Sequence, residues 1–195
     1  MNGKRNQDQR IYINNTVRED LMWAIDHIES SDGIHLFKSF QWTPSQADFT
    51  IYCDTYPDGM GFWYLTSKDG YYAPNSVNVP SNVIFYFESL CVLSALENVQ
   101  SKAPKGSKFL IYTDNSNSVD IFHTLHCLPP YNPLLKAAVD ILIHNDYSLW
   151  VLHVPGEENI IADALSHVHF SIALNSEPNL KLDIFHPPVL EGSSK

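Results

Sequence analysis

Two short apolar runs of this chain end in the same way, each in an aspartate. Residues 51–53 precede Asp54, and residues 111–113 precede Asp114. Parallel strands that are joined by a crossover helix bring their carboxyl ends to one edge of a sheet, where sites generally form. We therefore expect the two carboxylates to face each other at such an edge. The alternative is that each aspartate starts a turn or caps the next helix.

A third acid, Glu88, lies on the apolar side of a predicted helix. Helical spacing places it on the same stripe as four apolar residues, Cys91, Val92, Ala95 and Val99. This pattern directs the carboxylate toward the sheet. A buried carboxylate needs a cation, a hydrogen-bonding partner or a proton, because burying it unpaired is costly. The alternative is a half-buried position near the end of the helix.

A fourth acid, Asp163, lies on the flank of the apolar stripe formed by Ile161, Leu165 and Val168. Taken alone it could be a plain surface acid. The four acids predict chemistry only if they converge in space. A convergent set of carboxylate oxygens suits a hard cation such as Mg²⁺ or Mn²⁺.

The elements that must position these acids follow an α/β order. Strand patterns and helical patterns alternate with turn sequences. The expected strands cover 49–53, 61–65, 70–77, 109–113 and 148–154, and the expected helices cover 83–100, 116–125, 133–145 and 159–168. This order predicts a five-stranded mixed sheet, three antiparallel strands and then two parallel ones, with helices on both faces.

The two ends of the chain differ from this middle part. We expect residues 1–47 to form an N-terminal extension with one helix, since Leu21, Ile25 and Ile28 recur at helical spacing. Residues 48–170 form the expected central domain. Residues 171–195 contain several prolines and no sustained periodicity, which predicts a flexible C-terminal tail.

Charge and cysteine content limit the classes of function. The 12 Lys and Arg against 22 Asp and Glu give a formal charge of −10, which argues against a broad basic face for nucleic acid. Bound cations would reverse the local field.

The 3 cysteines, none in a CxxC pair, favour a reducing, intracellular setting such as cytoplasm or nucleus. No apolar run approaches the roughly 20 residues that span a bilayer, so no membrane association is expected.

Taken in order, the segments from Val17 to His167 resemble the ribonuclease H-like superfamily, and most closely the ribonuclease H domain of retrotransposon polyproteins. In that pattern the first acid, here Asp54, ends the first strand before a glycine-rich hairpin. The second acid opens the first long helix, as Glu88 does, and the third ends the fourth strand, as Asp114 does. The resemblance implies the α/β fold of ribonuclease H.

The most specific part of the resemblance is the segment from His153 to Ser166, whose Ala-Asp-Ala-Leu-Ser core looks like the closing motif of retrotransposon ribonuclease H domains. The residues Trp42-Thr43-Pro44 also resemble the connection between polymerase and ribonuclease H in fungal-type retroelements that carry a tyrosine recombinase. A reverse transcriptase polymerase domain is therefore an expected partner, although no polymerase motif occurs in this chain.

By resemblance, the function would be metal-dependent hydrolysis of the RNA strand of an RNA/DNA hybrid. Two Mg²⁺ or Mn²⁺ ions would lie among Asp54, Glu88, Asp114 and Asp163. His153 would relay a proton during product release, or else pack for structure. The residues assigned to the substrate side of the site are Asn115, Gly59, Gly61 and Asn159, with helix initiation as the alternative for Asn115.

Two other functions stay open at this stage. The family usually has small residues after the first acid, whereas this chain has Thr55-Tyr56-Pro57, which would crowd the hairpin. That departure and the net negative charge favour a catalytically silent, domesticated ribonuclease H-like interaction module. The remaining alternative is another nuclease or a strand-transferase of the same superfamily.

Overall fold

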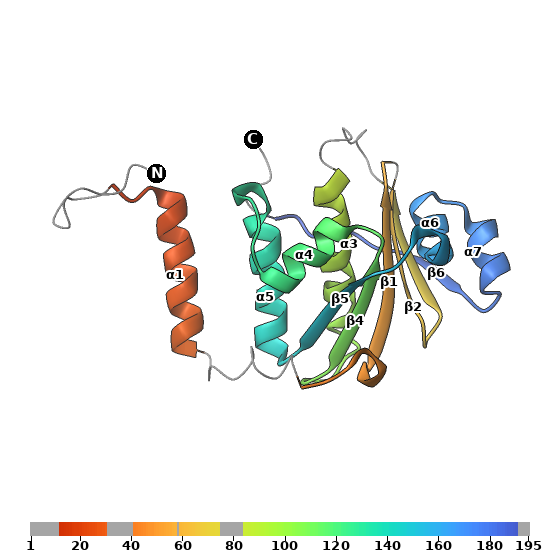
Figure 1. Ribbon diagram of the computed structural model, residues 1–195, viewed down its shortest axis with the longest axis horizontal. Coiled ribbons are helices and arrows are strands. Elements are labelled where there is room, and N and C mark those ends of the chain that lie inside the picture. The colour runs from red at the N-terminus through yellow and green to blue at the C-terminus, as the bar shows by residue number, and fades with distance from the viewer. Residues whose placement is uncertain (1–11, 31–40, 58, 75–83, 191–195) are drawn as a thin grey trace.

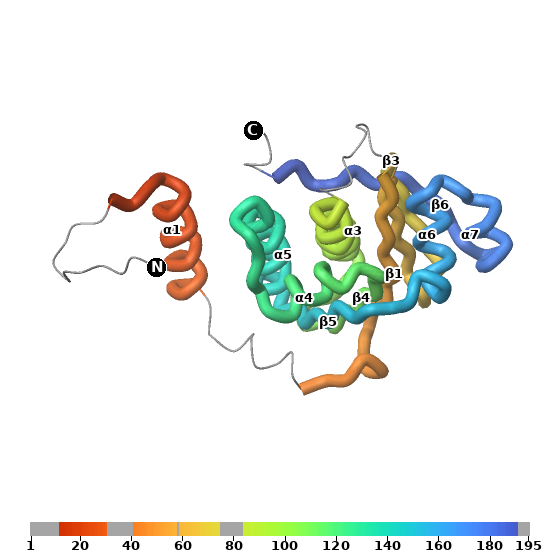
Figure 2. Tube along the Cα trace, turned by 45° about the horizontal axis from the view of Figure 1, so that its top comes forward, coloured from red at the N-terminus to blue at the C-terminus, as the bar shows by residue number. Residues whose placement is uncertain are grey.

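The computed structural model describes residues 12–30, 41–57, 59–74 and 84–190. A mixed sheet lies at the centre, with helices on both of its faces (Figure 1). Helix α1, Asn15–Ser30, lies at the outer edge of the molecule beside α5, Asn132–Asn145, and away from the sheet (Figures 1 and 2). The described part of the chain contains no helix that combines the length and apolar character needed to cross a membrane.

The sheet has six strands in the order β5-β4-β1-β2-β3-β6. Their bounds are β1 Phe49–Tyr56, β2 Gly59–Tyr64, β3 Asp69–Pro74, β4 Lys108–Thr113, β5 Ser148–His153 and β6 Lys181–Ile184. Strands β1, β2 and β3 are antiparallel neighbours, whereas β4 and β5 run parallel to β1. The expected arrangement of three antiparallel strands followed by two parallel ones is therefore confirmed.

The expected number of five strands is wrong, because β6 adds a sixth that pairs in parallel with β3. It follows α7, Phe170–Ser176, and apart from Phe170 both elements lie in the segment that we expected to be a flexible tail. Strand β6 has only four residues and is mostly exposed. Its formation depends on backbone hydrogen bonds to β3 rather than on a period of apolar residues, so the sequence carries little sign of it. The division of the chain into domains stays a prediction.

The larger apolar cluster lies between the sheet and three helices, α3 Ile84–Val99, α4 Ser116–Thr124 and α5. The predicted stripe of α3 is buried there: Cys91, Val92, Ala95 and Val99 are all 0% exposed. It packs with sheet residues such as Phe62. Cys91 and Cys53 both belong to this cluster as free thiols.

The smaller cluster lies on the opposite face, under α6, Ile160–Ser166, and α7. It contains Trp63, Leu165 and Leu180 together with alanines of the two helices. The predicted placement of helices on both faces is therefore confirmed (Figure 2). Three short 3₁₀ turns complete the described elements: η1 Pro44–Gln46, η3 Pro129–Tyr131 and η4 Gly156–Glu158.

Candidate active site

The four predicted acids come from four different elements and converge at one edge of the sheet. Asp54 lies near the end of β1, and Asp114 follows β4, which is parallel to β1. Glu88 lies in the second turn of α3, and Asp163 in α6. The carboxylate of Asp54 is repelled by those of Asp114 and Asp163, and that of Glu88 by Asp54 and Asp114. All four are therefore close enough to share one electrostatic environment.

Two of the four acids, Asp54 and Glu88, are buried. Asp54 is 6% exposed, and burial raises the pKa of its carboxyl to about 6. The hydrogen bond from Ser166 opposes this increase in pKa, whereas repulsion from Asp114 and Asp163 adds to it. The pKa of the Asp54 carboxyl therefore lies just below neutral pH, because burial and like charges raise it while hydrogen bonds from Ser166 and the Thr55 backbone lower it.

Glu88 is the other buried acid, also 6% exposed. Burial raises its pKa to about 9, with further contributions from repulsion by Asp54, Cys91 and Asp114. Its Oε2 atom is buried and has no hydrogen-bond partner. A buried carboxyl oxygen without a partner is costly, and a proton or a cation would relieve that cost.

The other two acids, Asp114 and Asp163, are exposed. The Asp163 side chain is 57% exposed, and its Oδ1 atom lies 3.5 Å from Nε2 of His167. The His167 ring in turn packs on Tyr56, with 3.6 Å between the ring centroids. The site therefore combines a buried pair of carboxyl groups with an exposed pair that solvent or a ligand can reach.

Ser166 contacts two of the four acidic residues, a position that the sequence interpretation did not assign to it. Its Oγ donates to Oδ2 of Asp54 at 2.5 Å and lies 2.8 Å from the backbone oxygen of Asp163. This hydroxyl links the Asp54 carboxylate on β1 to the backbone of Asp163 on α6. Its position three residues after Asp163 on the same helix was the only available signal, because the contact with Asp54 joins residues 112 positions apart.

Gly59 and Gly61, which we expected on the substrate side, lie against α6. A Cβ atom added to Gly61 would lie 2.5 Å from Cβ of Leu165 and 2.6 Å from the backbone N of Ser166. At Gly59 it would lie 2.5 Å from the backbone oxygen of Ser166. Gly61 is also the cross-strand neighbour of Asp54. Both glycines therefore allow α6 to approach the acid closely, and their contact with substrate stays a prediction.

The remaining predicted residues have clear positions. Asn115 caps α4, since its side chain accepts a hydrogen bond from the Ser118 backbone N–H at 3.0 Å, which is the alternative role considered for it. Asn159 is buried and donates from Nδ2 to the Cys53 backbone oxygen at 2.9 Å, and its Oδ1 atom has no partner. His153 is exposed at the end of β5. Roles in catalysis or substrate binding stay predictions for all three.

Two residues of the departure Thr55-Tyr56-Pro57 contact elements around the site. Thr55 Oγ1 donates to the backbone oxygen of Phe87 at 3.3 Å, next to Glu88 on α3. Tyr56 packs on His167, which lies just after α6. The two residues thus connect β1 to the two helices that carry acids. Crowding of the hairpin by these residues stays a prediction.

The donor set fits a hard divalent cation, although no metal cluster is already assembled. Within the described ranges, no three His, Cys, Asp or Glu side chains lie close enough together to hold an ion. Two of the carboxylates are engaged elsewhere, Asp54 by Ser166 and Asp163 by His167. The free Oε2 of Glu88 and the mutual repulsion of the acids are both features that a cation would relieve.

No family model matches the sequence, and no curated protein matches it. Among solved structures, LC11-RNase H1 isolated from compost is 21% identical, with 65% of this chain and 97% of that chain covered and a TM-score of 0.49. LC11-RNase H1 in complex with an RNA/DNA hybrid is 19% identical, with 60% and 93% covered and a TM-score of 0.48. RNase H1 from the halophilic archaeon Halobacterium salinarum NRC-1 is 18% identical, with 66% and 98% covered and a TM-score of 0.44. Likenesses of this size do not establish a shared activity.

Proposed function

We propose that this chain is a divalent-metal-dependent nuclease of the ribonuclease H type, which hydrolyses the RNA strand of an RNA/DNA hybrid. The single observation that carries the proposal is the convergence of Asp54, Glu88, Asp114 and Asp163 from four elements, with the buried Glu88 oxygen left without a partner. The retrotransposon type rests on the resemblance of the segment from His153 to Ser166.

Asp54, Glu88, Asp114 and Asp163 would hold the two Mg²⁺ or Mn²⁺ ions. When bound, the ions supply activation of the attacking water and neutralisation of charge on the phosphate. The chain itself keeps the acids in place, because Ser166 orients the Asp54 carboxylate and His167 contacts that of Asp163. His153, exposed at the same edge, is assigned the relay of a proton as product leaves.

Under this proposal, the negative charge of the chain affects how it binds substrate. A net charge of −10 and four converging acids repel phosphate in the absence of a cation. Hybrid binding should therefore depend on the divalent ion as strongly as cleavage does. Discrimination of RNA from DNA would depend on contacts with the 2′-hydroxyl group.

The test is cleavage of a labelled RNA/DNA hybrid by the purified chain, with Mg²⁺ or Mn²⁺, compared with the variant Asp114→Asn. We expect cutting that leaves 5′-phosphate and 3′-hydroxyl ends, and near-complete loss of it in the variant. Asp120→Asn is the matched control, because Asp120 is an exposed acid of α4 outside the four. Equal cleavage by the chain and by Asp114→Asn would reject the site.

Two further arms distinguish the alternatives. Duplex DNA and single strands are tested at the same salt concentration, and preferential cutting of either would assign another nuclease activity of the superfamily. A thermal shift with Mn²⁺ is measured in parallel, since an ion that binds only the folded chain stabilises it. Stabilisation without cleavage of any substrate would favour the interaction module.

A further inference from the structure

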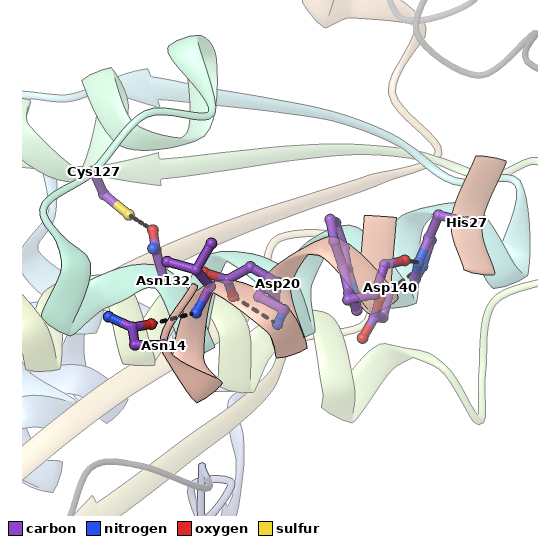
Figure 3. A network of polar contacts seen from close by, with 9 residues as sticks. Asn14, Asp20, His27, Cys127, Asn132 and Asp140 are labelled. Carbon is purple, nitrogen blue, oxygen red and sulfur yellow. Dashed lines mark hydrogen bonds and ion pairs between the residues drawn. The ribbon is translucent and has the colours of Figure 1, made fainter. Parts of the chain in front are cut away.

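Helix α1 is attached to the rest of the described chain by polar contacts with α5. Trp23 Nε1 donates to Oδ1 of Asp140 at 2.9 Å, and His27 Nε2 lies 2.8 Å from the same atom. Lys136 Nζ lies 3.2 Å from Asp20 Oδ1 and 5.3 Å from the centre of the Trp23 ring. Figure 3 shows this network, in which Asp20 and His27 of α1 face α5. One side of α1 is thereby occupied.

A different side of α1 carries an exposed apolar stripe. The exposed fractions are 44% for Val17, 50% for Leu21, 44% for Ile25 and 76% for Ile28. Their spacing of four, four and three residues aligns them along one face of the helix. Trp23 and His27 lie on the neighbouring face, so contact with α5 leaves the stripe uncovered. A contiguous apolar stripe on a surface helix indicates an interaction surface.

The stripe is complementary to itself when two copies of α1 run antiparallel. A two-fold axis at the middle of the stripe sets Val17 opposite Ile28 of the second copy, and Leu21 opposite Ile25 of the second copy. Each apolar residue then meets another. This is the arrangement that a closed two-fold interface requires, because the same surface is used by both copies.

The flanking charges favour the same pairing. Arg18 and Glu29 are exposed and lie on the same side of the stripe, near its two ends. Antiparallel pairing brings Arg18 of one copy next to Glu29 of the second copy, twice by symmetry. Parallel pairing would instead place this side of the two copies on opposite edges of the contact, so neither ion pair could form. Opposite charges across an interface select the antiparallel register.

We propose that α1 is a dimerisation helix whose Val17, Leu21, Ile25 and Ile28 pack antiparallel against the same stripe of a second copy of this chain. The helix has 16 residues, so the contact is about 24 Å long. An interface of that size supports a weak dimer, with a dissociation constant on the order of micromolar. α1 lies beyond α5 and away from α6 (Figures 1 and 2), so the acidic edge stays open in the dimer.

The test is sedimentation equilibrium of the full chain over a range of concentrations. We expect a monomer–dimer equilibrium that Leu21→Asp weakens at least about 10-fold, because it places a charge in the apolar contact. Arg18→Glu should also weaken it, whereas the double variant Arg18→Glu/Glu29→Arg should restore it, since both ion pairs re-form with reversed sign. Glu19→Lys, on the opposite side of α1, is the matched control and should change nothing.

Three results of these measurements would overturn the proposal or a part of it. A chain that is monomeric up to about 100 µM, well above the micromolar range expected here, overturns the proposal and leaves the stripe to a different protein. A dimer that Leu21→Asp does not weaken also overturns it. Failure of the double variant to restore dimerisation overturns the antiparallel pairing. Because these substitutions lie on an exposed face, circular dichroism should report unchanged helix content, and hybrid cleavage serves as a separate readout of the proposed function.

Discussion

The two faces of the sheet bury their acids in different ways. Glu88 belongs to α3, whose apolar side packs in the larger cluster, and one oxygen of its carboxyl group is buried without a partner. Asp54 points toward α6, where Ser166 donates a hydrogen bond. Both residues are 6% exposed, yet the pKa is raised to about 9 for Glu88 and only to about 6 for Asp54.

Two carboxyl groups that are equally buried can therefore have different pKa values. On the α3 face, which packs through large apolar side chains, Oε2 of Glu88 has no donor. On the α6 face, where backbones approach each other closely, Ser166 brings a hydroxyl group to Asp54. That approach depends on Gly61, which leaves room for α6 beside Asp54. The chemistry of the site thus depends on how each face is packed.

The contact most sensitive to change is that between Gly61 and α6. In Gly61→Ala the new Cβ would lie 2.6 Å from the backbone N of Ser166, and backbone cannot move aside cheaply. We expect a loss of about 3 kcal/mol in the free energy of unfolding, measured with urea. Gly156→Ala is the control, since its Cβ would meet only the side-chain Oδ2 of Asp114, at 3.3 Å, and should cost less than about 0.5 kcal/mol. Equal losses would contradict this role for Gly61.

The second prediction concerns the acid on the α3 face. The folded-state pKa of Glu88, about 9, lies above its ordinary value of 4.5, so its contribution to stability is present below pH 4.5 and is lost as pH rises toward 9. Without metal, Glu88→Gln should therefore be more stable than the parent by about 2 kcal/mol near pH 8, and by much less near pH 5.

Urea unfolding at the two pH values measures this difference. The control is Asp163→Asn, because the Asp163 side chain is 57% exposed and its replacement should change stability by less than about 0.5 kcal/mol. Added Mn²⁺ should stabilise the parent and not Glu88→Gln. A variant less stable than the parent near pH 8 would show that the buried carboxylate has a stabilising partner after all.

The third prediction concerns the acid on the α6 face. Ser166→Ala removes the hydrogen bond that lowers the pKa of Asp54, so that pKa should rise above about 6. The cost, about 1.5 kcal/mol, should appear at neutral pH, where Asp54 is ionised, and should shrink near pH 5. Ser94→Ala is the matched control on α3, since Ser94 donates only to the backbone oxygen of Leu90. Its cost should be smaller and independent of pH.

The smallest effect should come from the ion pair between Lys68 and Glu177, at 2.8 Å, which attaches the residue after α7 to the turn before β3. The hydrogen bond from Lys68 holds the pKa of Glu177 below its ordinary value. Its contribution is therefore present above that ordinary value and is lost as pH falls through the lowered one. Glu177→Gln should lower the melting temperature slightly at neutral pH, and not at an acidic pH at which Glu177 is already protonated. An equal decrease at both pH values would indicate disturbed packing instead of lost charge.

The positions of the acids followed from local patterns. The repeated strand endings at Asp54 and Asp114 predicted a shared edge, and parallel pairing of β1 with β4 places them there. The helical stripe predicted that Glu88 faces inward, and it is buried. Both predictions hold because strand and helix periodicity depend only on the side chains of one element.

Contacts between distant segments had no such local signal. β6 is held by pairing with β3, more than 100 residues earlier in the chain, and its four residues are too few for a period. The structure packs Gly59 and Gly61 against α6, a contact that the sequence interpretation did not predict. Thr55 contacts α3 and Tyr56 contacts His167, and neither contact has a local signal in the sequence.

The amino-acid sequence by itself determined the strands and α-helices from β1 to α6, which of their faces are apolar and where along them the four acids lie, because periodicity and turn residues act within a few positions of the chain. Only the tertiary structure decided that Ser166 reaches Asp54 and that Glu88 has a free oxygen. Those outcomes depend on which backbones approach each other closely, and that is a property of the packed sheet and helices rather than of any one segment.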